Sequence, residues 1–150
     1  MFILVVNANA TTDRALNGTW VDEGGNETTF NDGNFKVFVP SINSYGGRGI
    51  FSTNDGKITQ ITTHVFGDGL NYILKELILL DLMPPSTFRF SEKWYSSVEI
   101  QTELNRLECA GLLDIFLIFF SEITADYHVD GNLLILTIDG ERTTASRRKY

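Results

Sequence analysis

The sequence is poor in the residue types on which cross-links, metal sites and nucleic-acid binding depend. Its 150 residues include one cysteine, three prolines and two histidines. A single cysteine allows no disulfide within the chain and no cysteine-rich metal site. Lysine and arginine number 12 against 19 acidic residues, which gives a formal net charge of −7. Because affinity for nucleic acid comes mainly from cations that neutralise phosphates, we expect no nucleic-acid partner.

Signatures of catalysis are also missing. The sequence has no G-x-S-x-G nucleophile elbow, no glycine-rich phosphate loop of the dinucleotide or Walker type, and no calcium-binding loop of the EF-hand pattern. Several aspartates stand instead in short turn motifs, where their side chains favour tight turns. We therefore expect a protein that is not an enzyme and that has no cofactor and no metal site.

The apolar stretch at the N-terminus is too short to cross a membrane. Residues 1–6 are apolar, and Ala8-Asn9-Ala10 follows before a polar segment. A bilayer span needs about 20 residues, so we expect no membrane span. An apolar run followed by an A-x-A pattern is typical of the end of a secretory signal. Residues 1–15 are thus interpreted as the remnant of a signal peptide or a flexible N-terminus of a periplasmic or secreted protein; an ordinary first β-strand is the alternative.

Aromatic residues and glycines, in contrast, are plentiful. The chain contains 11 Phe, 5 Tyr and 13 Gly, and its hydrophobic fraction is 43%. This is enough apolar material for one core in a chain of single-domain length. The glycines suit many tight turns between short strands. We expect a single domain over residues 16–150.

Four motifs predict hairpin turns: Asn31-Asp32-Gly33-Asn34, Asn54-Asp55-Gly56, Asp130-Gly131-Asn132 and Asp139-Gly140-Glu141. Asp-Gly between alternating apolar runs is a strong hairpin signal, because type I′ turns need positive φ at both central residues. The flanking segments alternate as strands do, near 18–22, 27–31, 34–39, 47–53, 57–66, 124–129, 133–138 and 142–149. The pattern predicts a mainly β fold, an up-and-down antiparallel barrel of about eight strands.

Residues 68–122 have a different, helical texture. A leucine-rich stretch ends at Pro84-Pro85, and Ser96 with Glu99 fits a capping box at the start of a second helix that runs to about Ala110. Residues 112–120 are almost wholly apolar and fit either a short helix or a buried strand. We expect a largely helical insertion folded over the barrel.

Several short motifs occur in an order that resembles a known family. Gly18-Thr19-Trp20 opens the first expected strand and is similar to the Gly-x-Trp motif of lipocalins and the wider calycin group. Further matching segments spread over most of residues 16–149: Phe30-Asn31-Asp32-Gly33-Asn34-Phe35, Lys57-Ile58-Thr59, Thr62-Thr63-His64-Val65, Lys93-Trp94-Tyr95-Ser96 and Gly131-Asn132-Leu133-Leu134. Together they resemble the small bacterial lipocalin-like domains of secreted proteins. The resemblance implies a lipocalin-like β-barrel and says little about function.

The resemblance also implies a structural pair. In calycins the Trp of this motif packs across one end of the barrel against a basic residue of the last strand, which corresponds here to Arg147, with Arg142 as the alternative. A guanidinium over an indole face contributes roughly 0.5–2 kcal/mol. Trp20 and Arg147 are therefore expected to close the barrel rather than to bind a ligand.

The inward-facing positions of the expected strands define the candidate binding site. Alternation places these side chains on the inner surface: Phe30, Phe35, Phe51, His64, Tyr127, Leu134 and Leu136. We expect a non-catalytic protein that holds a small hydrophobic molecule in or at the mouth of the barrel. Because a barrel of this size can also be filled by its own side chains, the alternative is a secreted protein-interaction domain, such as a protease inhibitor or an adhesin, with an exposed apolar surface over 112–120.

Overall fold

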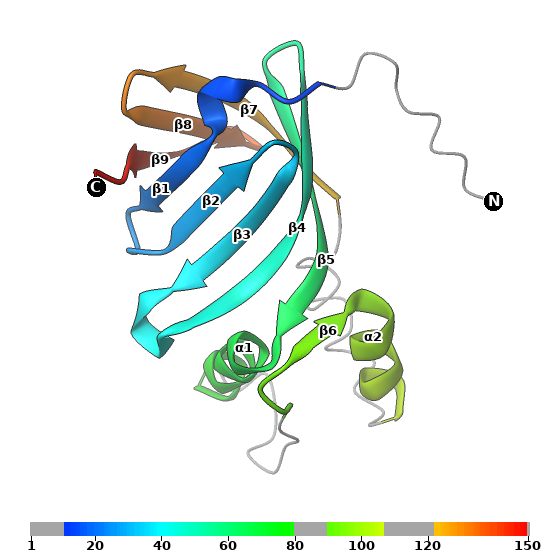
Figure 1. The fold of residues 1–150 in the computed structure, drawn as a ribbon. Helices are drawn as coiled ribbons and strands as arrows, with labels where there is room; N and C mark the ends of the chain where they lie inside the picture. The colour runs from blue at the N-terminus through cyan, green and yellow to red at the C-terminus, as the bar shows by residue number, and fades with distance from the viewer. Residues whose placement is uncertain (1–10, 80–89, 107–121, 150) are drawn as a thin grey trace, which may run out of the picture.

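The computed structural model describes residues 11–79, 90–106 and 122–149 (Figure 1). Residues 112–120, for which helix and strand were both open, lie outside the described residues. The elements in chain order are η1 Arg14–Leu16, β1 Gly18–Asp22, β2 Glu27–Asn31, β3 Asn34–Val39, η2 Pro40–Ile42, β4 Ser44–Asn54, β5 Lys57–Phe66, α1 Gly67–Leu79, β6 Trp94–Ser96, α2 Ser97–Arg106, β7 Glu122–Asp130, β8 Leu133–Ile138 and β9 Glu141–Arg147.

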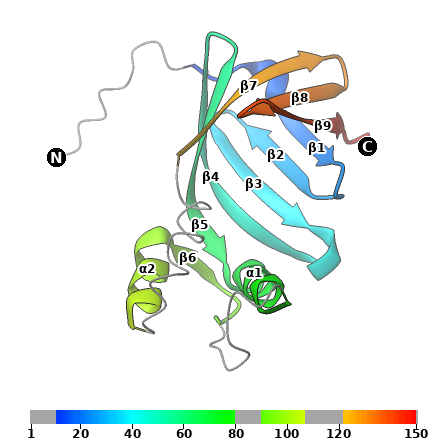
Figure 2. The ribbon, with the colours of Figure 1, turned by 180° about the vertical axis from the view of Figure 1, so that it is seen from behind.

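Eight of these strands form a closed antiparallel barrel. From β1 to β5 each strand pairs with the next one in the sequence, β5 then pairs with β7, and β7, β8 and β9 follow in order. The barrel closes where β9 pairs with β1. The curved wall is visible from both sides of the molecule (Figure 1, Figure 2). The predicted mainly β fold, an up-and-down barrel of about eight strands, is confirmed.

The hairpin turns adopt the geometry that their sequence favours. Asp32 and Gly33 have φ angles of 45° and 93°, and Asp55 and Gly56 have φ angles of 52° and 75°. Positive φ at both central residues is the mark of a type I′ turn, whose twist matches that of the flanking strands. The strands joined by these turns, β2 with β3 and β4 with β5, pair in register up to the turn itself.

The helices α1 and α2, which fit the expected helical insertion, lie between β5 and β7 in the chain. The short strand β6 lies there too, and the sequence did not indicate it. β7 pairs with β5 only as far as Ile61, and the three-residue β6 pairs with the far end of β5, from His64 to Phe66. Three residues are too few to show a strand period, which explains the omission. None of the described helices is long and apolar enough to span a membrane.

The predicted capping box is present at the start of α2. The Ser96 backbone N–H donates to Glu99 Oε2 over 2.8 Å, and the Glu99 backbone N–H donates to Ser96 Oγ over 3.3 Å. These two bonds satisfy amide groups that a helix start leaves without partners. The backbone N–H of Ser96 and, to a lesser degree, its side chain also lower the pKa of the Glu99 carboxyl, because they favour its charged form.

A β-bulge interrupts β5 and changes which side chains face inward. Arg48 pairs with His64 and Gly49 pairs with Thr62, so Thr63 is an extra residue on β5. One extra residue shifts the alternation, and every side chain beyond it moves to the opposite face of the sheet. The bulge therefore divides β5 into two parts that present different residues to the interior.

The core gathers at one end of the barrel. Its buried members come from the barrel strands and from η1: Leu16, Trp20, Phe30, Phe35, Phe51, Ile58, Ala125 and Leu134. They are contributed by strands on opposite sides of the barrel, so the same side chains that exclude water also hold the two halves of the wall together. At the other end of the barrel α1 lies across the start of β4 and the end of β5 (Figure 1).

A cluster around Trp20 joins the last strand to the first. The guanidinium carbon of Arg147 lies 4.2 Å from the centroid of the Trp20 ring. Arg147 also donates hydrogen bonds to the carbonyl oxygens of Asn17 over 2.7 Å and Ala15 over 2.8 Å. The indole N–H of Trp20 donates to the Leu16 carbonyl over 2.8 Å. This is the packing that the resemblance implied, and it fixes η1 over the end of the barrel.

Replacing Arg147 by methionine should destabilise the fold. Arg147→Met keeps an apolar stem over the indole but removes the charge and both hydrogen bonds, and we expect the free energy of unfolding to fall by about 2 kcal/mol. Urea denaturation measures this change. Arg142→Met, an exposed arginine on the same strand, is the matched control and should change stability by less than about 0.5 kcal/mol. Equal effects of the two substitutions would contradict the role assigned to Arg147.

Candidate functional site

Three of the predicted interior residues are packed against one another. The rings of Phe30 and Phe51 meet edge to face with centroids 4.8 Å apart, and those of Phe30 and Phe35 lie 6.5 Å apart. All three side chains are buried in the core cluster. Aromatic contacts of this kind stabilise a core beyond the area that they bury. Phe51 thus fills space, Phe35 also borders a hollow under α1, and Phe30 borders a hollow of the inner face beside the cluster.

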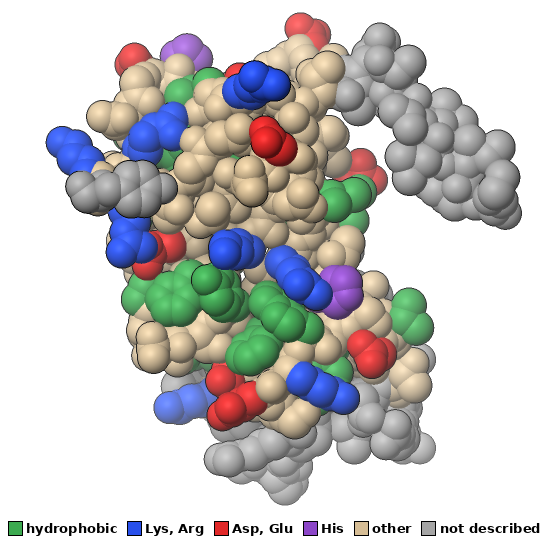
Figure 3. Space-filling model, in the orientation of Figure 1, with side chains coloured by type: hydrophobic (Ala, Val, Ile, Leu, Met, Phe, Trp, Pro, Cys, Tyr) green, Lys and Arg blue, Asp and Glu red, His purple; other side chains and the backbone are tan. Residues whose placement is uncertain are grey.

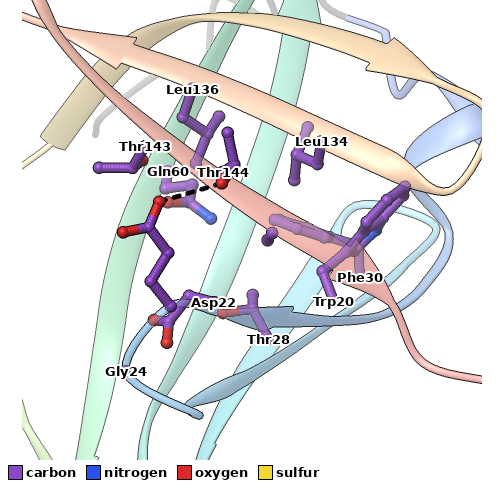
Figure 4. A pocket seen from close by; sticks show the side chains of 12 residues that line it. Trp20, Asp22, Gly24, Thr28, Phe30, Gln60, Leu134, Leu136, Thr143 and Thr144 are labelled. Atoms are coloured by element: carbon purple, nitrogen blue, oxygen red, sulfur yellow. Dashed lines mark hydrogen bonds between the residues drawn. The ribbon is translucent and has the colours of Figure 1, made fainter.

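That hollow lies between β1, β2, β8 and β9 and has a volume of about 320 Å³ (Figure 4). The predicted residues Leu134 and Leu136 form part of its wall, together with Trp20, Phe30 and Ala145. Leu134 is buried, whereas Leu136 is half-buried and packs against the core. The predicted interior residues of β8 therefore lie where a small molecule would contact them.

Three polar side chains line the same hollow and were not predicted: Thr28, Gln60 and Thr143. Strand positions occupied by polar residues are usually assigned to the outer surface, so hydropathy alone passes over them. Their positions in the alternating pattern of the strands do indicate that they face inward. Gln60 is two residues after the buried Ile58, and Thr28 is two residues before the buried Phe30.

The rim of the hollow is acidic. Asp22 and Glu23 border it from the turn between β1 and β2, and Thr144 Oγ1 donates a hydrogen bond of 3.0 Å to Glu23 Oε1 across the edge (Figure 4). No lysine or arginine lies among the described residues that line it. The hollow therefore combines an apolar wall with hydrogen-bonding groups and a negative rim.

A second hollow, about 270 Å³ in volume, lies under α1. Its wall is formed by inner residues of β3 to β5 and by α1, including Val37, Val39, Val65 and Tyr72. Gly69 brings α1 close to β4, since a Cβ on this residue would lie 2.7 Å from the Cα of Gly46. The helix thus closes this part of the barrel by direct backbone contact.

Tyr127 is held by a hydrogen bond rather than left open to a ligand. Its hydroxyl donates to Asp13 Oδ2 over 2.8 Å, and the Asp13 backbone N–H donates to Thr53 Oγ1 over 2.9 Å. Thr11 bridges to Thr53 through backbone bonds. The domain was expected to begin at residue 16. The described part of the segment before it, from residue 11, is nevertheless hydrogen-bonded to the barrel. Burial, together with the bond and the charge of Asp13, raises the pKa of Tyr127.

His64 lies on the outer surface, contrary to its predicted inward position. Strict alternation from Ile58 would turn His64 inward, but the buried Val65 follows the buried Ile58 by an odd number of positions. The bulge at Thr63 produces this reversal. His64 instead borders a groove on the outer face with Lys36 and Arg48, and its Nδ1 lies 3.0 Å from Thr63 Oγ1.

The described residues contain no group of three or more His, Cys, Asp or Glu side chains arranged to hold a metal ion. Comparison with known proteins gave no further guide: the chain matches no protein-family profile, no curated protein and no solved structure. The assignment of a function therefore rests on the geometry of the hollows and of the outer groove.

The hydrogen bond of Tyr127 predicts a loss of stability at alkaline pH. Because the pKa of Tyr127 is raised in the folded state, its stabilising contribution is complete below the unfolded pKa of about 10 and is lost as the pH rises through the folded value. Tyr127→Phe should lower the free energy of unfolding by about 1 kcal/mol at neutral pH. Urea denaturation across the alkaline range should show the two proteins converging; curves that stay parallel would contradict this.

Gly69→Ala should loosen α1. The added methyl group would collide with the backbone of Gly46, so the helix must move away, at a cost of about 1–3 kcal/mol. Thermal unfolding gives the change in stability, and amide hydrogen exchange shows whether protection is lost in α1. Gly24→Ala, whose Cβ would make only ordinary contacts, is the control. Unchanged exchange in α1 would show that the close approach to β4 is not required.

Proposed function

We propose that this protein is a non-catalytic binding protein that holds one small, mainly apolar molecule inside its barrel. The observation that carries the proposal is the hollow of about 320 Å³ lined by Trp20, Phe30, Leu134 and Leu136. A barrel of eight strands either fills its interior with side chains or keeps room for one small ligand. Here the aromatic cluster fills one part, and the hollow beside it falls within the ~300–1,000 Å³ of ordinary ligand sites.

The lining indicates the chemistry of the ligand. Gln60, Thr28 and Thr143 offer hydrogen-bond donors and acceptors to a molecule whose body rests on the apolar wall. Asp22 and Glu23 would repel an anion at the rim, and the described lining has no cation to neutralise one. Burial of an unpaired charge is costly. We therefore favour a neutral apolar ligand with a hydroxyl or carbonyl group over a fatty acid.

The resemblance noted in the sequence is consistent with this proposal. A closed eight-stranded antiparallel barrel, with Arg147 over Trp20 at one end, supports assignment of the chain as a lipocalin-like domain of the calycin kind. That assignment, and the apolar N-terminal segment with its A-x-A pattern, make a bacterial periplasmic or secreted carrier the favoured context. Both points remain part of the proposal.

A protein-interaction domain with a filled barrel is the alternative. It has less support because the inner face keeps two hollows beside its aromatic cluster. The apolar surface that it predicts over 112–120 lies outside the described residues.

A bulky residue in the hollow should abolish binding. We expect the neutral fluorescent probe N-phenyl-1-naphthylamine to bind the wild-type chain, and Leu136→Trp to weaken that binding at least tenfold, a change of about 1.4 kcal/mol. Ile135→Trp, the neighbouring position on the opposite face of β8, is the size-matched control and should leave affinity unchanged. Fluorescence titration measures both, and circular dichroism verifies the fold of each variant.

Native mass spectrometry of protein purified without delipidation provides an independent test. Extra mass that disappears on denaturation would identify a captured ligand and its chemical class. A wild-type chain that carries no extra mass and does not bind the probe, or a Leu136→Trp variant that binds it as well as the control, would overturn the proposal.

A further inference from the structure

The outer face of the barrel carries a second, chemically distinct groove. It runs across β2 to β5, has a volume of about 450 Å³, and is bordered by Lys36, Arg48 and His64. Along β2, Thr28 and Phe30 line the interior hollow of about 320 Å³, whereas Thr29 and Asn31 line the groove. The two sites therefore lie on opposite faces of this strand.

The β5 bulge adds His64 to the basic part of this groove. By placing His64 opposite Arg48 it brings two basic side chains together on the outer face. Lys36 pairs with Arg48 on the other side, from β3. Three basic side chains on three adjacent strands thus form one row across the sheet, as side chains at paired positions lie side by side.

Aromatic rings extend the groove along one side. Tyr45 and Trp94 have ring centroids 6.4 Å apart, and Phe38 and Phe66 pack edge to face against them at 5.2 Å each. Lys36 Nζ lies 5.1 Å from the Tyr45 centroid, and the Arg48 guanidinium carbon lies 4.7 Å from the Trp94 centroid. Figure 3 shows this hydrophobic group on the surface, bordered by basic side chains. The cations and rings therefore form one continuous surface.

The charge of this surface opposes that of the chain. The formal net charge is −7, yet no carboxylate lies among the described residues that line the groove. Within the described part of the chain, neither Lys36 nor Arg48 forms an ion pair. The nearby Glu99 carboxylate, whose pKa is lowered by Ser96 and, to a lesser degree, by Lys93 and His64, is hydrogen-bonded at the start of α2. The cations of the groove remain available to an anion.

We propose that this groove binds an acidic oligosaccharide. Asn31, Asn34 and Thr63 in its lining supply neutral donors and acceptors for sugar hydroxyls. Lys36 and Arg48 supply charged partners for carboxylate or sulfate groups, and Arg48 has the planar fork that matches either. Tyr45 and Trp94, over which Lys36 and Arg48 lie, hold these two cations in place beside the groove.

The same features fit a nucleic acid less well. Single-stranded nucleic acid is held by many cations that track its backbone and by rings open for base stacking. Here the row contains only Lys36, Arg48 and His64 within an acidic chain, and Lys36 and Arg48 already lie over the rings of Tyr45 and Trp94. A short acidic glycan needs fewer cations and makes fuller use of the amide and hydroxyl groups.

Calorimetric titration of the full chain tests the proposal with four probes of similar length. These are a galacturonic acid hexasaccharide, a chondroitin sulfate hexasaccharide, neutral maltohexaose and a thymidine hexanucleotide. We expect one or both acidic sugars to bind, more weakly as salt is raised, and the choice between them identifies carboxylate or sulfate as the recognised group. Binding should also change the tryptophan fluorescence, since Trp94 lies at the groove whereas Trp20 is 1% exposed.

Variants assign the binding to the groove. Arg48→Gln and Tyr45→Ala should each weaken binding of the acidic sugar at least tenfold, and Arg142→Gln, an exposed arginine on β9, should leave it unchanged. Leu136→Trp should also leave it unchanged, so that failure of the interior site and failure of this one are distinguishable. Absence of binding to both acidic sugars, equal binding of maltohexaose, tighter binding of the hexanucleotide, or equal loss in Arg142→Gln would overturn the proposal.

Discussion

The rest of the structure depends on the closure of the barrel between β9 and β1. The register there covers only three pairs, Trp20 with Arg147, Val21 with Ser146 and Asp22 with Ala145, so the backbone bonds of the seam are few. Arg147 reinforces it by contacting the Trp20 ring and two carbonyl oxygens of the η1 segment. If the seam opened, two strand edges would be exposed and the core would lose one wall. The interior hollow is lined mainly by strands on the two sides of this seam, β1 and β2 on one side and β8 and β9 on the other.

Much of the barrel could be predicted because its signals are local. Asp-Gly turns need positive φ, which few other sequences supply, and the strands between them alternate over five or more residues. The capping box of α2 is equally local, since Ser96 and Glu99 satisfy each other's backbone groups. The interior aromatics followed from alternation within β2 and β3. In each case the residues that determine the structure are close together in the sequence.

The features that could not be predicted depend on contacts between distant segments. The extra residue at Thr63 is visible only once β4 is paired with β5, and it reversed the expected position of His64. β6 is a strand because it lies where β7 leaves β5, not because its three residues have a strand period. Gln60 and Thr28 are polar but face inward, because the hollow beside them leaves room for groups that a packed core would exclude. Both proposed sites arise from such non-local arrangements.

The alternation of side chains across one sheet explains how a small barrel could serve two unlike ligands. Along β2, Phe30 lines the interior hollow while the neighbouring Thr29 lines the outer groove. The two faces also differ in charge: the described lining of the larger interior hollow contains carboxylates and no Lys or Arg, and that of the groove contains cations and no carboxylate. Because local potentials of opposite sign favour opposite ligands, an anion directed to the groove is disfavoured at the rim of the hollow. Under the two proposals, a chain of net charge −7 would combine an apolar carrier site with an anion-binding surface, and neither ligand would compete for the other's site.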